Sequence, residues 1–310
     1  MTPKMKKVLM VSIPCAVVAI VAIVVAVILL GGGNGYRRIQ VYRIDGGANV
    51  ERGAEEKITP YVNMLLESND VVKTLGDGYL YLKLDDDKFL MAEPNSHFEL
   101  IATGDAKNSK TRIELKCGAV TVHITNPLSA GSDFEVGTGN STMAVRGTSF
   151  RVGVTEDGES TQTTVQVFGG EVSVQPMMNG STVGESESIT ADCEAVVTTT
   201  DEGVEVEKNE EPLQLPDLDE EILDFLKEGI ENGNDVGASA EEIDRIIADK
   251  QKTFTVTFVF GDTVFATERV AYGQTAKIPA LMPTPQGAWD FDFSTEITAD
   301  VTVRWVEQAE

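Results

Sequence analysis

The sequence predicts a mainly β protein that begins with a transmembrane helix and carries an acidic helical linker before a small terminal β-domain. Three observations support this fold class. An uncharged apolar run occupies residues 8–30, short segments of alternating apolar and polar residues fill residues 36–200, and alternation returns after Thr253. The length of 310 residues leaves room for two or three domains, and a hydrophobic content of 42% is ordinary for a folded chain.

The first element is the predicted membrane anchor. After a short tail, residues 1–7 (MTPKMKK), residues 8–30 contain no charged side chain. At about 1.5 Å of rise per residue, they form a helix long enough to cross a hydrocarbon core of about 30 Å. A cleavable signal peptide has a shorter apolar stretch and an A-x-A-like site, and Pro14 directly before Cys15 disfavours a lipoprotein signal. We therefore expect an uncleaved, single-pass anchor.

The charges that flank this helix favour a cytoplasmic amino terminus. The numbers of basic residues on the two sides of the helix are equal, so the positive-inside rule alone does not decide the orientation. The compact lysine cluster and the free amino group favour a cytoplasmic amino terminus. The acidic domains then lie outside the membrane, because long domains translocate regardless of their charge. The basic residues compared are Lys4, Lys6, Lys7, Arg37, Arg38 and Arg43.

A juxtamembrane segment, residues 31–69, and an all-β domain, residues 70–200, follow the anchor. The juxtamembrane segment starts with GGGNG and offers one helical candidate, residues 54–68, which Pro60 restricts. The β-domain alternates with a period of two between turn residues, which predicts a sandwich or a solenoid-like stack. Its clearest alternating segments are residues 79–84, 111–116, 119–124, 163–168 and 171–175.

Residues 201–252 are rich in Asp and Glu and contain two helical patterns. DLDEEILDFLKEGIENG has apolar residues at helical spacing behind an Asp cap, and SAEEIDRIIADK predicts a second capped helix. We interpret this region as a solvated linker with two short helices. The alternation in TFTVTFVF and ADVTVRWVEQ predicts a compact β-domain over residues 253–310. The apolar positions of the first helix are Leu218, Ile222, Phe225 and Leu226.

The composition argues against several functional classes. A net charge of −25 disfavours nucleic acid, whose phosphates need clustered Lys and Arg. The two histidines, His97 and His123, fit no zinc spacing, and we predict no metal, no cofactor and no catalytic residue. Residues 232–237 (NGNDVG) lack the ligands of a calcium loop, because Ile243 stands where a bidentate Glu is needed. Residues 85–88 (DDDK) are interpreted as a solvated turn.

The cysteines leave two alternatives open. Cys15 lies in the predicted anchor, so Cys117 and Cys193 are the pair in the rest of the chain. A disulfide between them is compatible with an extracytoplasmic location, but it requires their Cβ atoms to approach within about 4 Å. Two unpaired thiols in the core are an equally good interpretation.

The most specific segment of the β-domain is Ala144-Val145-Arg146-Gly147-Thr148, with Phe150 behind it and a valine-rich strand pair at 165–174. Together with DGYLYLKLDDDKFLMAEPNSHFELI upstream, these motifs closely resemble the FecR-like domain of bacterial envelope proteins, over about residues 70–200. The resemblance implies a β-domain that senses a partner outside the membrane. In the best-studied FecR-type proteins, a cytoplasmic amino-terminal domain also binds a sigma factor. Residues 1–7 are too few to bury roughly 600 Å² per partner, so direct anti-sigma action is not expected.

The terminal domain is similar to a second family. TVTFVFGDTVFATERVAYGQTAKIP and ITADVTVRW, with Trp289 between them, resemble the small repeat of Gram-positive surface proteins known as the Listeria–Bacteroides or internalin B repeat. This resemblance covers about residues 253–307 and implies a β-grasp-like fold. Because both families are surface modules, it also agrees with an extracytoplasmic location.

Arg146 is predicted to act as a structural clamp. A guanidinium has five donors that can satisfy several backbone carbonyls, Gly147 can adopt a positive φ, and Thr148 can cap the turn. The alternative is that Arg146 pairs with a carboxylate of a partner. We favour the clamp, because a charged group between strands must first be satisfied.

Two functions from different classes remain. The favoured one is a non-catalytic, membrane-anchored binding or sensory module of the bacterial envelope, whose partner is an envelope protein, a peptide or a glycan. The alternative is a structural protein of cell-surface assembly or adhesion. An exposed β-edge that accepts a partner strand suits either function.

Overall fold

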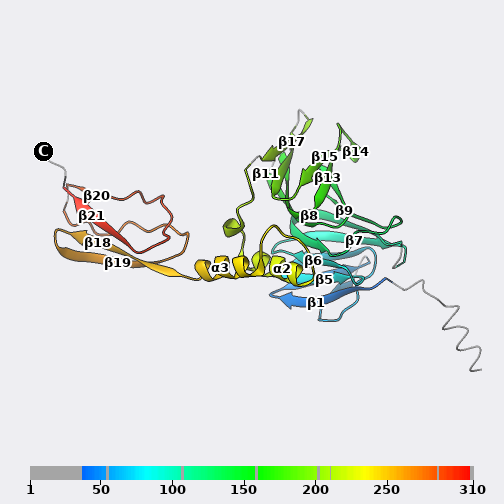
Figure 1. Cartoon of the computed structure of the whole chain (residues 1–310), viewed down its shortest axis with the longest axis horizontal. Coiled ribbons are helices and arrows are strands. Elements are labelled where there is room, and N and C mark those ends of the chain that lie inside the picture. Colours follow the sequence, from blue (N-terminus) through cyan, green and yellow to red (C-terminus); the bar gives the residue numbers. More distant parts are fainter. Residues whose placement is uncertain are drawn as a thin grey trace, which may run out of the picture.

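The computed structural model describes residues 37–53, 56–105, 108–157, 160–200, 203–209, 211–284 and 286–307. The predicted membrane helix, residues 8–30, lies outside these described residues. Within the described ranges, no helix is both long enough and apolar enough to span a bilayer. The observed structure is mainly β, as predicted, with short helices after the large β-domain (Figure 1).

The large β-domain consists of two sheets that share one long strand. The first half of this strand, β8 (Lys110–Ile124), pairs in one sheet and its second half in the other. Gly118, at φ +80°, lies at the junction, where a Cβ would fall 2.4 Å from the Cα of Ser96. Only glycine tolerates this close approach.

We name the two sheets A and B. In spatial order, sheet A contains β1 (Ile39–Asp45), β5 (Tyr79–Leu84), β6 (Lys88–Ala92), β8, β11 (Ser149–Asp157), β12 (Ser160–Gly169), β16 (Cys193–Thr200) and β17 (Gly203–Asn209). Sheet B contains β3 (Glu56–Ile58), β2 (Ala48–Arg52), β4 (Asp70–Thr74), β7 (His97–Thr103), β8, β9 (Asp133–Gly137), β10 (Ser141–Val145), β13 (Glu171–Met178) and β15 (Glu187–Thr190). The short strand β14 (Ser181–Thr182) pairs with the end of β13.

The two sheets enclose one hydrophobic core. Alternate residues of each strand point into it, which is the direct consequence of the period-two pattern in the sequence. On β5, for example, Leu80, Leu82 and Leu84 are fully buried in this core together with Phe98 and Leu100 of sheet B. The architecture is therefore a two-layered sandwich in which one strand belongs to both layers.

The domain begins before residue 70 and continues beyond residue 200. β1 pairs with β5 and β2 pairs with β4, so the juxtamembrane segment predicted for residues 31–69 is wrong from Ile39 onward. β17 likewise extends sheet A past the predicted end. The helix predicted over residues 54–68 is also wrong: its described residues form β3 and a loop that bonds along β1.

The acidic region is not a solvated linker. It contains a 3₁₀ turn, η1 (Leu215–Asp217), and two helices, α2 (Glu220–Glu231) and α3 (Ala240–Lys250), at the predicted positions. The apolar stripe of α2 packs on the face of sheet A that points away from the sandwich core. This second core unites Ile222, Leu223, Phe225 and Leu226 of α2 with Tyr81, Met91 and Phe168 of sheet A. Asp224 and Glu231 are exposed on the opposite face of the helix, whereas Glu228 is half-buried and accepts a hydrogen bond from the hydroxyl of Tyr42 at 2.9 Å.

The terminal domain lies at the far end of α3 (Figure 1). Its strands follow the order β19 (Thr263–Ala271), β18 (Thr253–Phe260), β21 (Val301–Val306) and β20 (Ala288–Trp289). β18 forms a hairpin with β19 and runs parallel to β21, and their inner residues pack around Phe258 and Trp289. The domain is therefore a small β-fold, and its resemblance to the surface repeat stays a prediction.

Candidate binding groove

The outer face of sheet A carries the polar residues that lie between its inward-pointing valines. On β8, β11 and β12 these are Thr121, His123, Ser149, Arg151 and Gln166, which alternate with core residues such as Phe150 and Val152. α2 covers this face over β5, β6 and β8. Beyond α2, toward β16, the face is left open.

His123 joins the covered part of this face to α2. Its Nε2 lies 3.0 Å from the carbonyl oxygen of Phe225, and its Nδ1 lies 3.0 Å from the hydroxyl of Ser149. Because a carbonyl only accepts, Nε2 carries the proton and Nδ1 accepts from Ser149. Burial lowers the pKa of His123 to about 4, against a smaller opposing effect of the Phe225 carbonyl, so the imidazole is neutral.

The pair formed by His123 and Ser149 is structural and not a nucleophile with its base. Both side chains are buried beneath α2. The second imidazole nitrogen bonds a backbone carbonyl, whereas a catalytic histidine is oriented by a carboxylate and has a nucleophile open to substrate. The ring also packs 4.5 Å from that of Phe225. These contacts fix α2 on the sheet.

Arg151 and Glu93 form a bidentate ion pair on the outer face. Two nitrogens of the guanidinium bond the two carboxylate oxygens at 2.7 and 2.8 Å, and the hydroxyl of Thr121 donates to the same carboxylate at 3.0 Å. Desolvation acts to lower the pKa of Arg151, but the hydrogen bonds and charge of Glu93 outweigh it, so that the pKa is raised. Glu93 is buried, and its charge is therefore neutralised within the protein.

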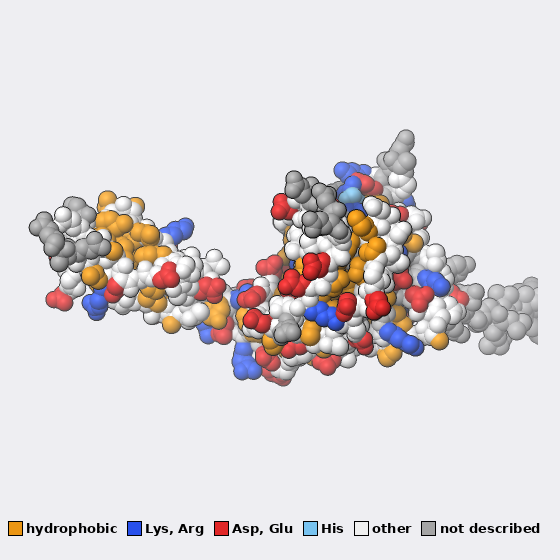
Figure 2. Space-filling model, turned by 90° about the horizontal axis from the view of Figure 1, so that it is seen from above, with side chains coloured by type: hydrophobic (Ala, Val, Ile, Leu, Met, Phe, Trp, Pro, Cys, Tyr) orange, Lys and Arg blue, Asp and Glu red, His pale blue; other side chains and the backbone are white. Residues whose placement is uncertain are grey.

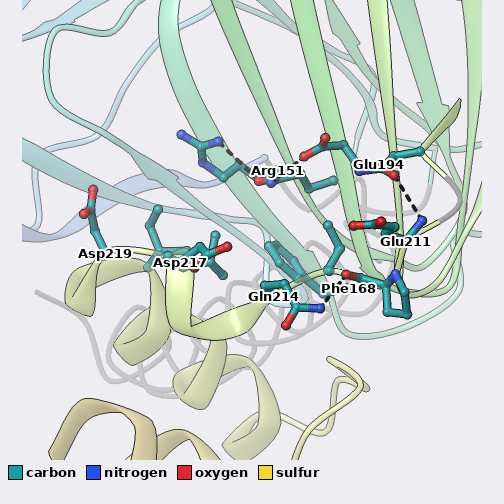
Figure 3. A pocket seen from close by; sticks show the side chains of 13 residues that line it. Arg151, Phe168, Glu194, Glu211, Gln214, Asp217 and Asp219 are labelled. Atoms are coloured by element: carbon teal, nitrogen blue, oxygen red, sulfur yellow. Dashed lines mark hydrogen bonds between the residues drawn. The ribbon is translucent and has the colours of Figure 1, made fainter. Parts of the chain in front are cut away.

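A groove of about 380 Å³ opens between this ion pair and the segment that leads into α2. Its walls come from two parts of the chain: Arg151 and Glu194 from the strands, and Asp217 and Asp219 from the helical segment (Figure 3). Phe168 and Ile222 supply apolar surface. The remaining lining residues are Gln166, Asn209, Glu211, Pro212, Leu213, Gln214 and Leu218.

A second cavity, of about 510 Å³, adjoins the groove. The two share Phe168, Leu213 and Gln214, and the second continues toward Val236 and Ile246. The chain over residues 211–219 therefore crosses the open part of sheet A with accessible space on both sides. We call this crossing segment the strap. Its Leu213 amide donates to Asp192 at 3.1 Å, which ties the strap to the turn before β16.

The groove is negatively charged. Among its described lining residues Arg151 is the single cation, and Glu93 already neutralises it. Glu194 accepts a hydrogen bond from the amide of Gln166 at 2.8 Å, whereas Glu211, Asp217 and Asp219 are exposed to solvent. A segment with a cationic side chain and an apolar stem would complement these walls and the Phe168 surface.

The residues that the sequence singled out lie elsewhere. Arg146 is exposed at the turn between β10 and β11 and makes no hydrogen bond or ion pair with the described part of the chain, so it does not clamp backbone carbonyls. Its neighbours do hold the turn. Gly147 adopts φ +111° beside Pro127, Thr148 donates to the carbonyl of Glu171 at 3.0 Å, and Phe150 is fully buried in the sandwich core.

Cys117 and Cys193 are both free thiols, so the disulfide is not formed. Cys117 is exposed and Cys193 is half-buried, and therefore neither is a core thiol. His97 lies half-buried on β7, away from the groove. Within the described residues, no group of His, Cys, Asp or Glu side chains is arranged to hold a metal ion.

Sequence reasoning missed Arg151, Phe168 and Glu194. One signal could have identified their surface. On β5, β6 and β12 large apolar residues occupy both phases of the alternation, as in YLYLKL and KFLMA, which indicates strands that are buried on both faces. The apolar stripe of the following helix then needs a surface of this kind. The end of such a covered face is where a groove is expected.

Three comparisons with known proteins bear on this domain. No curated protein matches the sequence. Two crystal structures from Parabacteroides distasonis, each described as a "putative anti-sigma factor", are similar in part. The first is 18% identical over 45% of this chain and 58% of its own, with a TM-score of 0.36. The second is 13% identical over 77% of this chain and 99% of its own, with a TM-score of 0.39.

The chain thus spans less than two thirds of the first of these structures. The model of the FecR protein family matches residues 70–173, from the start of β4 to the start of β13. This range includes Arg146 and its turn, Glu93, His123 and Arg151. Residues 70–173 are a FecR family domain.

Proposed function

We propose that this chain is a non-catalytic binding module of the bacterial envelope, anchored by residues 8–30, with its FecR domain outside the membrane. Its groove binds a basic, partly apolar segment of a partner protein. The observation that carries this proposal is the groove itself, an open cleft with an apolar floor and with carboxylates on both walls, of which Glu194 is hydrogen-bonded to Gln166 and Asp217 and Asp219 are exposed to solvent. The FecR family match over residues 70–173 supports the module class.

Site-specific photo-cross-linking in cells tests the groove. A photoreactive phenylalanine analogue replaces Gln214, which is exposed in the groove, or Asp157, which is exposed at the end of β11. We expect one discrete adduct from position 214 and none from position 157. Equal adducts from both positions, or none from either, would refute the groove as the binding surface.

Charge variants make this test specific. The groove variant carries Glu194→Gln, Glu211→Gln, Asp217→Asn and Asp219→Asn, and it should lose the adduct. The matched control removes the same number of charges from exposed positions outside the groove and should retain it: Glu156→Gln, Asp157→Asn, Glu205→Gln and Glu207→Gln.

A membrane-impermeant maleimide tests the location. Because Cys117 is exposed and free, it should react on intact cells without a reductant. If the β-domain lies inside the cell, Cys117 will react only after lysis. Cys117→Ser measures the background labelling, because this variant retains only Cys15, in the proposed anchor, and the half-buried Cys193.

A second candidate, surface assembly or adhesion, is favoured by the terminal domain. Trp289, Trp305 and Phe291 line an apolar pocket of about 390 Å³, and the nearby Leu281 and Met282 are exposed. Apolar side chains gather on the visible face of this domain (Figure 2). If it mediates assembly, the full chain self-associates in detergent, and Leu281→Asp with Met282→Asp abolishes this in sedimentation. A chain that stays monomeric at all concentrations excludes this role.

A further inference from the structure

The loop between β3 and β4 presents three apolar side chains to solvent. Tyr61 is 64% exposed, Val62 50% and Leu65 55%. Their neighbours Met64 and Leu66 are buried in the sandwich core. Single exposed apolar residues are ordinary on a protein surface, but here three fall within one short loop. We call Tyr61, Val62 and Leu65 the loop patch.

Backbone hydrogen bonds to β1 hold the loop patch in place. The loop runs antiparallel along β1 and covers its free edge. Hydrogen bonds of 2.7 to 2.9 Å join Val41 to Asn63 and Met64, and Ile39 to Leu66. The loop backbone is thus ordered before any partner binds, so binding to the loop patch costs little ordering entropy.

The position of β1 connects the loop patch to the predicted anchor. Leu65 bridges to Gln40 on β1, three residues after Arg37, and β1 lies at the lower edge of the large domain (Figure 1). Residues 31–36 lie between the apolar run and Arg37, and fully extended they reach about 20 Å. The edge of β1 is therefore tethered close to the bilayer that residues 8–30 are proposed to cross.

We infer that the loop patch rests on the lipid surface of that bilayer. Tyrosine is enriched where membrane and water meet, and aliphatic side chains beside it can enter the interface. Arg38 is exposed directly before β1, Lys57 is exposed on β3, which leads into the loop, and their charges suit the phosphates of lipid headgroups. Glu67, at the end of the loop, is paired with Arg52 at 2.8 Å. Because residues 31–36 connect the domain to the proposed anchor, this contact is intramolecular, and a small apolar patch is enough to keep the domain on the lipid surface. The inference rests on the proposed anchor.

Fluorescence of the full chain in lipid nanodiscs tests the inference. Cys15, Cys117 and Cys193 are replaced by Ser, and an environment-sensitive dye is attached at Val62→Cys or, separately, at Tyr61→Cys. The matched control is Leu281→Cys, which is 76% exposed on the terminal domain. At positions 61 and 62 we expect a blue shift, loss of quenching by aqueous iodide, and quenching by a spin label at the lipid headgroup. At position 281 we expect no blue shift, full quenching by iodide and no quenching by the lipid spin label.

The other outcomes distinguish failure of the proposed anchor from failure of this inference alone. If the chain fails to float with the nanodiscs, both the anchor and this inference are wrong. If it floats but positions 61 and 62 are quenched by iodide as readily as position 281, the inference alone is wrong. Protection from iodide without quenching by the lipid spin label means that a protein surface covers the loop patch, which also overturns the inference.

Discussion

Lowering the pH should destabilise the β-domain through His123. The buried imidazole is neutral in the folded state, where burial lowers its pKa from 6.5 to about 4. Between these two pH values the unfolded chain binds a proton that the folded chain excludes. The stabilising contribution is therefore complete above pH 6.5 and is lost as the pH falls toward 4.

The size of this effect follows from the shift. At 1.36 kcal/mol per pKa unit, the complete loss is about 3 kcal/mol, and about 2 kcal/mol of it should occur between pH 7.5 and pH 5. For a domain of this size, 2 kcal/mol corresponds to a decrease in melting temperature of about 5 °C. Burial raises the pKa of Glu228, which contributes with the opposite sign, so the effect must be measured as a difference between variants.

His123→Gln provides that difference. The glutamine amide can donate to the Phe225 carbonyl and its oxygen can accept from Ser149, but it does not titrate. Urea unfolding at pH 7.5 and pH 5 should show that this variant loses about 2 kcal/mol less than the parent chain. His97→Gln, at the half-buried second histidine, is the control and should keep most of the parent's pH dependence. If the His123→Gln and parent profiles coincide, the imidazole is not excluded from solvent as argued.

Three further predictions concern stability. Gly229→Ala should destabilise α2 in urea unfolding although alanine is the better helix former by about 1 kcal/mol, because its Cβ would fall 2.8 Å from the His123 ring; a stabilised variant contradicts this packing. Arg151→Leu should cost about 3 kcal/mol by leaving Glu93 buried and unpaired, and adding Glu93→Leu should restore most of the loss; strictly additive losses would show that the two charges do not interact. Gly147→Ala should cost about 1 kcal/mol because of its positive φ, whereas Arg146→Ala should leave the free energy of unfolding unchanged; a large loss at Arg146 would restore the clamp hypothesis.

Periodicity predicted the elements well because it is a local property of the chain. The alternating segments 79–84, 163–168 and 171–175 became β5, β12 and β13, and the segments 111–116 and 119–124 became the two halves of β8. The two helices in the acidic region were also predicted correctly. Alternation predicts which side chains of a strand point into the core, but it does not predict which strands pair with it. It therefore could not show that β8 passes from one sheet to the other at Gly118.

The site was less predictable, because its residues depend on what covers the second face of sheet A. The motif RGTSFR contains two arginines, and the sequence drew attention to Arg146. The other, Arg151, is half-buried. It shares a strand with Phe150 and Val152 but has the opposite phase, which places it on the outer face beside Glu93. Only the docking of α2 on this face decides which polar side chains border a groove.

The order of strands in sheet A relates the two proposed surfaces to each other. The loop patch lies along β1, at one edge, and the groove lies over β11, β12 and β16, near the other edge. Strands lie about 4.8 Å apart, and six spacings separate β1 from β16 in the order described above, so the groove lies about 20–30 Å across the sheet from the loop patch. If the domain rests on the bilayer through β1 with sheet A standing upright, its groove lies well above the lipid surface. The same orientation keeps the acidic groove walls away from anionic headgroups, at more than twice the screening length of about 8 Å at physiological salt. Contact with lipid through one edge and binding of a basic partner segment near the other edge are thus compatible in a single orientation.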